Sequence, residues 1–240
     1  NGGANSIAVA EHTILLILAL YKKLRPYDNA LRRGVWTREK DHPHGLFELS
    51  GKIVGIIGLG NIGKALAQRL KGFEVQTVYY DIIRYTDHEK PLNVRYVSFE
   101  ELLRTSDIIT LHVPLDESTR NYIQKKELSL VKNSAILINT SRGGVVNEED
   151  LFQALKGKKI AGAGLDVFSR EDEMEKGTYV NPLFSLENVV VTPHHAGHSY
   201  DTMFRRIDIA YGNILRSARG ERPKYVVNES VFNQTCVSKR

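Results

Sequence analysis

The sequence of 240 residues predicts an α/β fold, a doubly wound parallel sheet with helices on both faces. Three observations predict it. Short apolar runs alternate with helical patterns along most of the chain, which is typical of right-handed βαβ units. Three glycines, Gly58, Gly60 and Gly63, lie between one such run and a helix. Polar residues follow several of the apolar runs, at the edge where open sheets of this class bind ligands.

The composition excludes several classes of protein. The formal charge is +5 and no block of about five like charges occurs, so nothing favours a nucleic-acid partner. Cys236 is the only cysteine, which excludes an intrachain disulfide and suits a reducing compartment. The apolar stretch 13–21 is too short to span a bilayer and has no basic leader. We therefore expect a cytoplasmic protein with no nucleic-acid or membrane partner.

The chain begins with a predicted helix over 6–23 that is apolar on nearly every side. Such a helix is buried on more than one face, as between two domains or in a dimer interface. A short amphipathic helix is expected over 28–36. The following loop contains His42 and His44, but two histidines alone do not make a metal site and no further ligands lie nearby. No metal is predicted.

The central part of the chain alternates between predicted strands and predicted helices. The expected strands are 53–57, 75–80, 107–112, 135–139, 160–164 and 188–191. The expected helices are 61–72, 98–104, 125–131 and 147–156. Ser98 and Asn147 are candidate N-cap residues for two of these helices. A last helix over 200–218 carries an apolar stripe formed by Met203, Ile207, Ala210, Ile214 and Leu215.

The glycine-rich turn predicts an anion site. Gly58 permits the turn, Gly60 lets a phosphate approach the backbone, and Gly63 lets the helix pack close to the strand. The free N–H groups and the dipole at the start of the helix then face a pyrophosphate. This is the arrangement of a Rossmann-type dinucleotide-binding fold. The alternative, a glycine turn of structural use alone, is much weaker because a second apolar run ends at Asp81.

Asp81 is placed where such a fold has the carboxylate that accepts the hydroxyl groups of the adenosine ribose. A carboxylate repels a 2′-phosphate, so Asp81 predicts NAD rather than NADP. Arg84, three residues further on, weakens this preference slightly.

The ends of the predicted strands carry the residues suited to chemistry. Arg142 follows the run 135–138 and could hold a carboxylate bidentately. His194 follows another run and is a candidate general acid/base. Glu171 lies in a polar segment and could pair with that histidine, fixing its tautomer and favouring its charged form. Spacing alone leaves His195 and His198 as alternatives for the histidine, and Glu173 and Glu175 for the carboxylate.

Five motifs in order, GLGNIG, HVPL, NTSRGG, GAGLDVF followed by Glu171, and TPHHAG, resemble the D-isomer-specific 2-hydroxyacid dehydrogenase family over about residues 3–228. The resemblance implies that Arg142 binds the substrate, that His194 is the general acid/base and that Glu171 is its carboxylate partner. It also implies that Asp166 lies near the nicotinamide amide. The cofactor-binding residues it implies are Gly58, Gly60, Asn61, Ile62, Gly63, Asp81, Val113, Pro114, Thr119, Thr140, Ser141, Arg142, Asp166, His194 and Gly197.

The family implies hydride transfer between NAD and the C2 atom of a small D-2-hydroxy acid or 2-oxo acid, in a homodimer. Its members usually have a preceding half-domain that supplies a lid and a substrate loop. We therefore expect 1–199 to be the NAD-binding domain, with an interdomain or dimer helix at its start. We expect 200–240 to be the C-terminal helix and tail of a substrate domain that is mostly absent. On this expectation the chain alone binds NAD but turns over substrate poorly.

Two other functions compete with this one. The first is an NAD-sensing binding protein similar to the corepressors that share the fold and the same three residues; turnover of 2-oxo acids separates it from an enzyme. The second is a cofactor domain from another class of Rossmann enzyme. In that case Arg142, Glu171 and His194 would share no common cleft.

Overall fold

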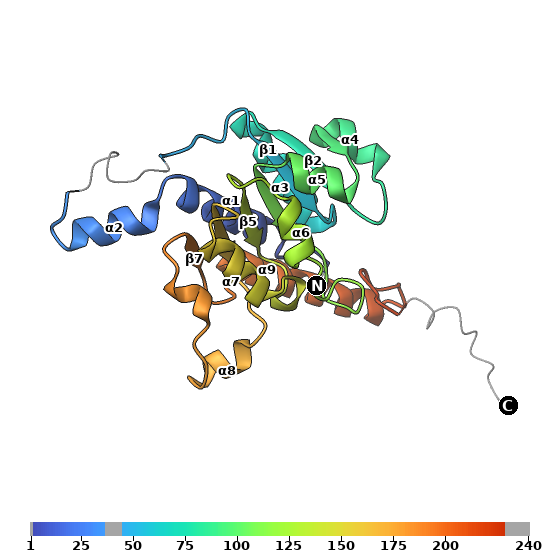
Figure 1. Cartoon of the computed structure of the whole chain (residues 1–240). Coiled ribbons are helices and arrows are strands. Elements are labelled where there is room, and N and C mark those ends of the chain that lie inside the picture. Colours follow the sequence, from blue (N-terminus) through green and yellow to red (C-terminus); the bar gives the residue numbers. More distant parts are fainter. Residues whose placement is uncertain (1, 37–44, 229–240) are drawn as a thin grey trace.

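The computed structural model describes residues 2–36 and 45–228, so the predicted loop with His42 and His44 lies outside the described residues. Within these ranges the chain forms a seven-stranded sheet in the order β3-β2-β1-β4-β5-β6-β7 (Figure 1). All neighbouring strands are parallel. The strands are β1 Ile53–Ile57, β2 Gln76–Tyr80, β3 Val94–Tyr96, β4 Ile108–Leu111, β5 Ile136–Asn139, β6 Gly162–Leu165 and β7 Val189–Val191. The strand order reverses between β1 and β4, which creates the crevice where such sheets bind ligands.

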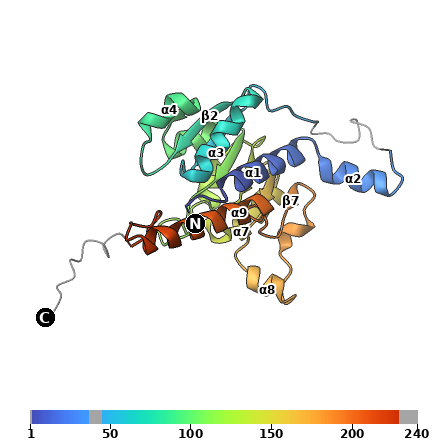
Figure 2. The same ribbon diagram turned by 180° about the vertical axis from the view of Figure 1, so that it is seen from behind.

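Helices cover both faces of the sheet, as the sequence predicts. On one face α1 packs against α3 and crosses over β5, β6 and β7 (Figure 2). On the other face lie α5, α6 and α7 (Figure 1). The bounds of these helices are α1 Ser6–Tyr21, α3 Asn61–Leu70, α5 Phe99–Thr105, α6 Lys125–Leu130 and α7 Glu148–Lys156. The predicted N-caps are confirmed: the Ser98 and Asn147 side chains accept hydrogen bonds from the N–H groups of Glu101 and Asp150.

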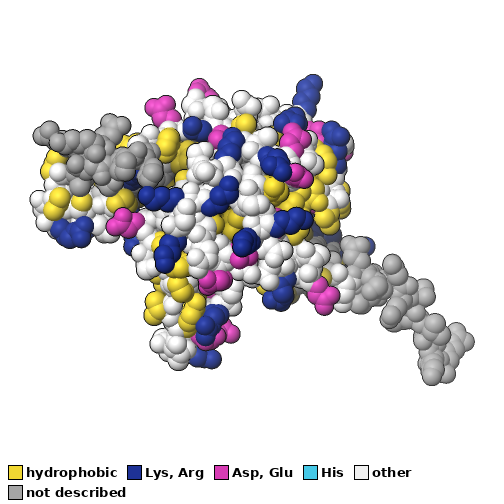
Figure 3. Space-filling view, viewed as in Figure 1, with side chains coloured by type: hydrophobic (Ala, Val, Ile, Leu, Met, Phe, Trp, Pro, Cys, Tyr) yellow, Lys and Arg dark blue, Asp and Glu magenta, His cyan; other side chains and the backbone are white. Residues whose placement is uncertain are grey.

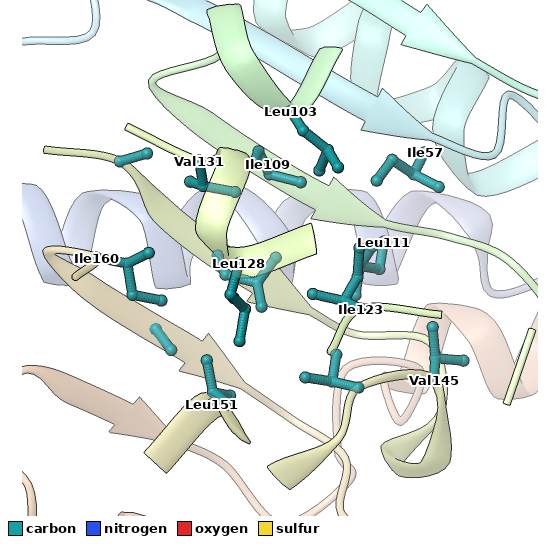
Figure 4. Packing of buried hydrophobic residues seen from close by; sticks show 14 of the residues in the cluster. Ile57, Leu103, Ile109, Leu111, Ile123, Leu128, Val131, Val145, Leu151 and Ile160 are labelled. Atoms are coloured by element: carbon teal, nitrogen blue, oxygen red, sulfur yellow. The ribbon is translucent and has the colours of Figure 1, made fainter. Parts of the chain in front are cut away.

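The sheet therefore has two hydrophobic cores, one on each face. Side chains of β1 alternate between them: Val54 and Ile56 belong to the α1/α3 core, and Ile57 belongs to the other. Figure 4 shows the second core, where Leu103 of α5 and Leu128 of α6 meet the strand residues. Since the central strands β1, β4, β5 and β6 are buried on both faces, they read as continuous apolar runs and not as alternating patterns.

Four further helices lie at the edges of the body. They are α2 Leu24–Arg32, α4 Thr86–Leu92, α8 Glu171–Glu175 and α9 Tyr200–Ala218. In Figure 1 α2 projects to one side and α8 lies at the end of a protruding loop. Thr202 is the single buried residue of α9, whose apolar side chains are otherwise exposed or half-buried.

One expectation about elements was wrong, and three elements were not predicted. The second helix begins at Leu24, because Lys23 adopts a left-handed conformation (φ 50°) that separates the helix from α1. It ends at Arg32, four residues before the predicted end. The pair α4 and β3 was not predicted, since α4 is polar and contains Pro91 while β3 has only three residues. The polar segment around Glu171 forms a short helix.

Charged side chains of both signs are mixed on one face of the molecule. On the face in Figure 3, Lys and Arg side chains are interspersed with Asp and Glu. Over the part of the chain that the structure describes, no helix combines the length and apolar character that crossing a bilayer demands. The same residues contain no group of three or more His, Cys, Asp or Glu side chains arranged to hold a metal ion.

Candidate active site

The glycine turn between β1 and α3 touches the end of β4. Gly58 has φ +95°, and a Cβ atom there would lie 2.7 Å from the carbonyl oxygen of His112 and 3.0 Å from Val113 Cγ1. A Cβ at Gly63 would lie 2.2 Å from the Gly58 carbonyl oxygen. Both positions therefore require glycine. A Cβ at Gly60 would meet no atom within 4 Å, so this residue faces open space at the helix N-terminus.

This turn fits the pyrophosphate of a dinucleotide. The backbone N–H groups of Asn61 and Ile62 lie in the first turn of α3. The N–H groups of a helix's first turn have no acceptor within the helix, so these two are available to an anion. Asp81 lies at the mouth of the turn, where its Oδ2 atom accepts a hydrogen bond of 2.7 Å from the Leu59 N–H. The Asp81 carboxylate thus lies beside the anion site, at the end of β2, as the sequence predicts for a ribose-binding group.

The loops after β4 and β5 line the next part of the same edge. Thr119 donates a hydrogen bond of 2.7 Å to the Pro114 carbonyl oxygen and so closes the loop after Val113. The Thr140 hydroxyl lies 3.1 Å from that of Thr13 on α1. The Ser141 hydroxyl donates to Asn139 Oδ1 over 2.7 Å. Because the three hydroxyl groups are engaged by the protein, these residues shape the loops, and their backbone is what they offer to a cofactor.

Arg142 is brought to the edge of a pocket by the glycine that follows it. A Cβ at Gly143 would lie 1.9 Å from the carbonyl carbon of Phe168, so the turn after β5 packs directly on the loop after β6. The resulting pocket has a volume of about 210 Å³ and is lined by Arg142, Phe168 and Glu171 among others. The Arg142 guanidinium donates one hydrogen bond to the Ser141 carbonyl oxygen. Its other N–H groups make no hydrogen bond to the described residues.

His194 and Glu171 form a pair. His194 Nδ1 lies 2.8 Å from Glu171 Oε2, and Glu171 Oε1 accepts a hydrogen bond of 2.8 Å from the Phe168 N–H. An ionised carboxylate only accepts, so the ring donates from Nδ1 and presents Nε2 outward. The His194 backbone is left-handed (φ 55°), a conformation that few residues other than glycine adopt readily.

Asp166 holds this histidine in place from beneath. The carboxylate is fully buried and accepts hydrogen bonds from the Thr192 hydroxyl (2.6 Å) and from the N–H groups of His195 and Ala196 (2.9 Å each). The Asp166 carbonyl oxygen accepts from the His194 N–H over 2.7 Å. Asp166 therefore fixes the loop 192–196, in addition to any contact it makes with a nicotinamide.

Sequence reasoning missed His12, which reaches the same cluster from α1. Its Nε2 atom lies 2.8 Å from the Thr192 hydroxyl, which gives its own proton to Asp166, so the His12 ring is the donor. Burial lowers the pKa of His12, and the nearby Asp166 carboxylate raises it by less. No local pattern marks this residue, because its partners lie about 180 positions away along the chain.

The alternatives that spacing left open do not form such a pair. The rings of His195 and His198 meet edge to face, with centroids 5.5 Å apart. Glu173 forms an ion pair with Arg170. Gly197 lies apart from the pocket, beside Asn5, and Gly3 is packed against Asn61. The segment before α1 thus contacts the first residue of α3 and the loop after β7.

Arg142 and Glu171 line one pocket, and His194 contacts Glu171, so the three residues share a cleft. The hypothesis of a cofactor domain from another class of Rossmann enzyme required them to be separated, and it is contradicted. A dinucleotide edge beside an arginine pocket and a His–Glu pair defines a dinucleotide-dependent oxidoreductase.

Comparison with known proteins identifies the family. Residues 14–196 match a protein-family model, that of the NAD binding domain of D-isomer specific 2-hydroxyacid dehydrogenases. The chain is 41% identical over 231 residues to a glyoxylate reductase of Korarchaeum cryptofilum, covering 95% of this chain and 68% of that protein. It is 40% identical over 237 residues to a glyoxylate reductase of Thermococcus litoralis, covering 97% and 70%.

A solved structure agrees with these relatives. The D-lactate dehydrogenase of Lactobacillus jensenii, crystallised with NAD+, has a TM-score of 0.84 and 32% identity, covering 93% of this chain and 69% of that one. The chain belongs to the D-isomer-specific 2-hydroxyacid dehydrogenase family. It is an NAD-dependent oxidoreductase. The proteins named here are all enzymes, and none supports the corepressor alternative.

Proposed function

We propose that this protein reduces a small 2-oxo acid to the 2-hydroxy acid, with D configuration wherever the product C2 atom is a stereocentre. Glyoxylate, which the names of the two relatives above specify and whose product is achiral, is the first substrate to test. The observation that carries the proposal is the contact of 2.8 Å between His194 and Glu171 beside the Arg142 pocket. Reduction of a carbonyl beside a carboxylate requires a proton donor of fixed orientation, here His194. It also requires a group that binds the carboxylate, here the Arg142 guanidinium with its unengaged N–H groups.

Each residue has a distinct role in this proposal. Arg142 binds the substrate carboxylate through its unengaged N–H groups and orients the adjacent carbonyl. His194 holds a proton at Nε2 and gives it to the carbonyl oxygen as the C2 atom is reduced. Glu171 keeps the ring oriented and stabilises its charged form. NADH, when bound at the glycine turn, supplies the hydride.

The same proposal covers the cofactor contacts, the domain division, the compartment and the oligomeric state. The glycine turn with Asn61, Ile62 and Asp81 binds the pyrophosphate and the adenosine ribose, and the other cofactor contacts are those that the family resemblance implies. Residues 1–199 form the NAD-binding domain, and 200–240 belong with a substrate domain. The protein acts in the cytoplasm as a homodimer. The exposed apolar face of α9 supports the domain division, because an unpaired apolar stripe of this length needs a partner surface.

The experiment follows NADH absorbance in full-length protein supplied with glyoxylate and other 2-oxo acids. We expect His194→Asn to lower kcat by about 100- to 10,000-fold, the usual contribution of a general acid. Glu171→Gln should lower kcat more than it changes KM, and Arg142→Gln should mainly raise KM. The matched control is His195→Asn, a neighbouring histidine outside the pair, which should retain activity within about threefold. Tight NADH binding without oxidation of NADH by any 2-oxo acid would contradict the proposal.

A further inference from the structure

Arg84 is held by an ion pair close to the predicted adenosine site. It lies three residues after Asp81, on the loop that leads from β2 to α4. Its Nε atom donates to Glu89 Oε1 over 2.7 Å, and its Nη2 atom donates to Glu89 Oε2 over 3.0 Å. This is a bidentate contact, the strongest geometry available to an arginine and a carboxylate.

Glu89 is itself anchored to the core. The Tyr79 hydroxyl donates to Glu89 Oε1 over 3.0 Å, and Tyr79 is a fully buried residue of β2. The same hydroxyl accepts a hydrogen bond of 2.9 Å from the Tyr85 N–H, which fixes the loop beside Arg84. The Glu89 side chain is only 21% exposed although it lies on a surface helix. The partner of Arg84 therefore has a defined position.

The guanidinium is also linked to the Asp81 backbone through Tyr96. The Arg84 Cζ atom is 5.6 Å from the centre of the Tyr96 ring, and the Tyr96 hydroxyl donates to the Asp81 carbonyl oxygen over 3.4 Å. A second basic side chain nearby, Lys64, lies over the ring of Tyr85, with its ammonium 4.3 Å from the centroid. Arg84 is thus an arginine close to Asp81, the residue proposed to bind the adenosine ribose, where NADP would carry its 2′-phosphate.

NADP differs from NAD by that 2′-phosphate, and its binding in this fold depends on a nearby arginine that neutralises it. We infer that Glu89 determines cofactor specificity by holding Arg84 in an ion pair, which denies the 2′-phosphate its cation and adds to the repulsion by Asp81. The inference rests on the proposed role of Asp81 at the adenosine ribose. It assigns discrimination to a residue eight positions beyond the carboxylate that sequence patterns single out.

The pair is partly solvated, with Arg84 57% exposed, so its effect on affinity is expected to be moderate. The test measures the Kd of NADH and of NADPH by fluorescence titration. Glu89→Gln removes the charge and retains an acceptor for Tyr79. We expect it to tighten NADPH binding by about 3- to 10-fold and to leave the NADH Kd within about twofold. The double variant Glu89→Gln/Arg84→Ala should lose this gain.

The matched control is Asp87→Asn, on the same helix. It removes the same charge from a carboxylate that accepts a hydrogen bond from the hydroxyl of its neighbour Thr86 and forms no ion pair with an arginine among the described residues. NADPH binding should stay within about twofold of the parent. Two outcomes for the controls would overturn the inference: an equal gain in NADPH affinity in Asp87→Asn, or a gain that survives the loss of Arg84. It would also be overturned if both Glu89→Gln and Glu89→Ala left the NADPH Kd unchanged, or if both weakened NADH binding. If the parent itself does not bind NADH, the proposed function fails instead.

Discussion

His112 follows β4 at the carboxyl edge of the sheet, and both of its ring nitrogens are buried with no hydrogen-bond partner among the described residues. Burial lowers its pKa to about 3. The ring is therefore neutral in the folded protein at ordinary pH. The backbone carbonyl oxygen of His112 lies against Gly58, so this residue also borders the glycine turn.

This histidine should make the protein sensitive to acid. In the unfolded chain a histidine titrates near pH 6.5, so as the pH falls the unfolded state binds the proton first and stability is lost between about pH 6.5 and 3. From pH 8 to pH 5 the loss from His112 is about 2 kcal/mol. His112→Phe should remove that part of the pH dependence in urea unfolding. The exposed His88→Phe is the control, and an unchanged pH dependence in His112→Phe would contradict the prediction.

The glycines of the turn should separate binding from stability. Gly63→Ala places a Cβ atom 2.2 Å from the Gly58 carbonyl oxygen, so we expect a loss of about 1–3 kcal/mol in the free energy of unfolding together with a large loss of NADH affinity. Gly60→Ala points into open space and should weaken NADH binding while stability stays within about 0.5 kcal/mol. Thermal melting and NADH titration of both variants decide this. Equal effects of the two substitutions on stability would show that the turn geometry is misassigned.

At the scale of the element, α1 depends on small residues in the strand beneath it. A Cβ atom at Gly164 of β6 would lie 2.9 Å from Leu16 Cβ and 2.9 Å from Ile138 Cδ1. Gly164→Ala should therefore push α1 away from the sheet and cost about 1–3 kcal/mol. Gly72→Ala, where a Cβ meets no atom within 4 Å, is the control and should change stability by less than about 0.5 kcal/mol. Urea denaturation measures both, and similar midpoints would contradict the close packing of α1.

The elements that the sequence predicts well are those with local or strongly apolar signals. The N-caps at Ser98 and Asn147 are hydrogen bonds between residues three apart, so they can be read directly. The buried strands are visible as apolar runs. By contrast, β3 has three residues and forms only because it pairs with β2, a tertiary contact that leaves no local pattern. The break between α1 and α2 lies at Lys23, whose left-handed backbone has no glycine to mark it; the nearest sequence signal is Pro26 in the first turn of α2.

At the scale of the whole molecule, α9 presents an apolar face to solvent in this chain. Ile207 is 54% exposed and Ile214 is 65% exposed. Ile207→Ser and Ile214→Ser should therefore change the free energy of unfolding by less than about 0.5 kcal/mol. Leu66→Ala, in the core between α3 and the sheet, should cost about 2–5 kcal/mol. Calorimetry of the 240-residue chain makes the comparison. A loss above about 1 kcal/mol for either α9 variant would show that α9 packs on this domain.

The sequence by itself determined the parallel sheet, the glycine turn and the identity of the residues suited to the chemistry, because each depends on apolar runs or on short motifs. The tertiary structure alone decided which of them meet. It paired His194 with Glu171 while Glu173 turned to Arg170, brought His12 from α1 to Thr192, and placed Glu89 against Arg84. The physical reason is that a hydrogen bond between side chains depends on distances of about 3 Å. Those distances are set by how helices and loops pack on the sheet, and not by spacing along the chain.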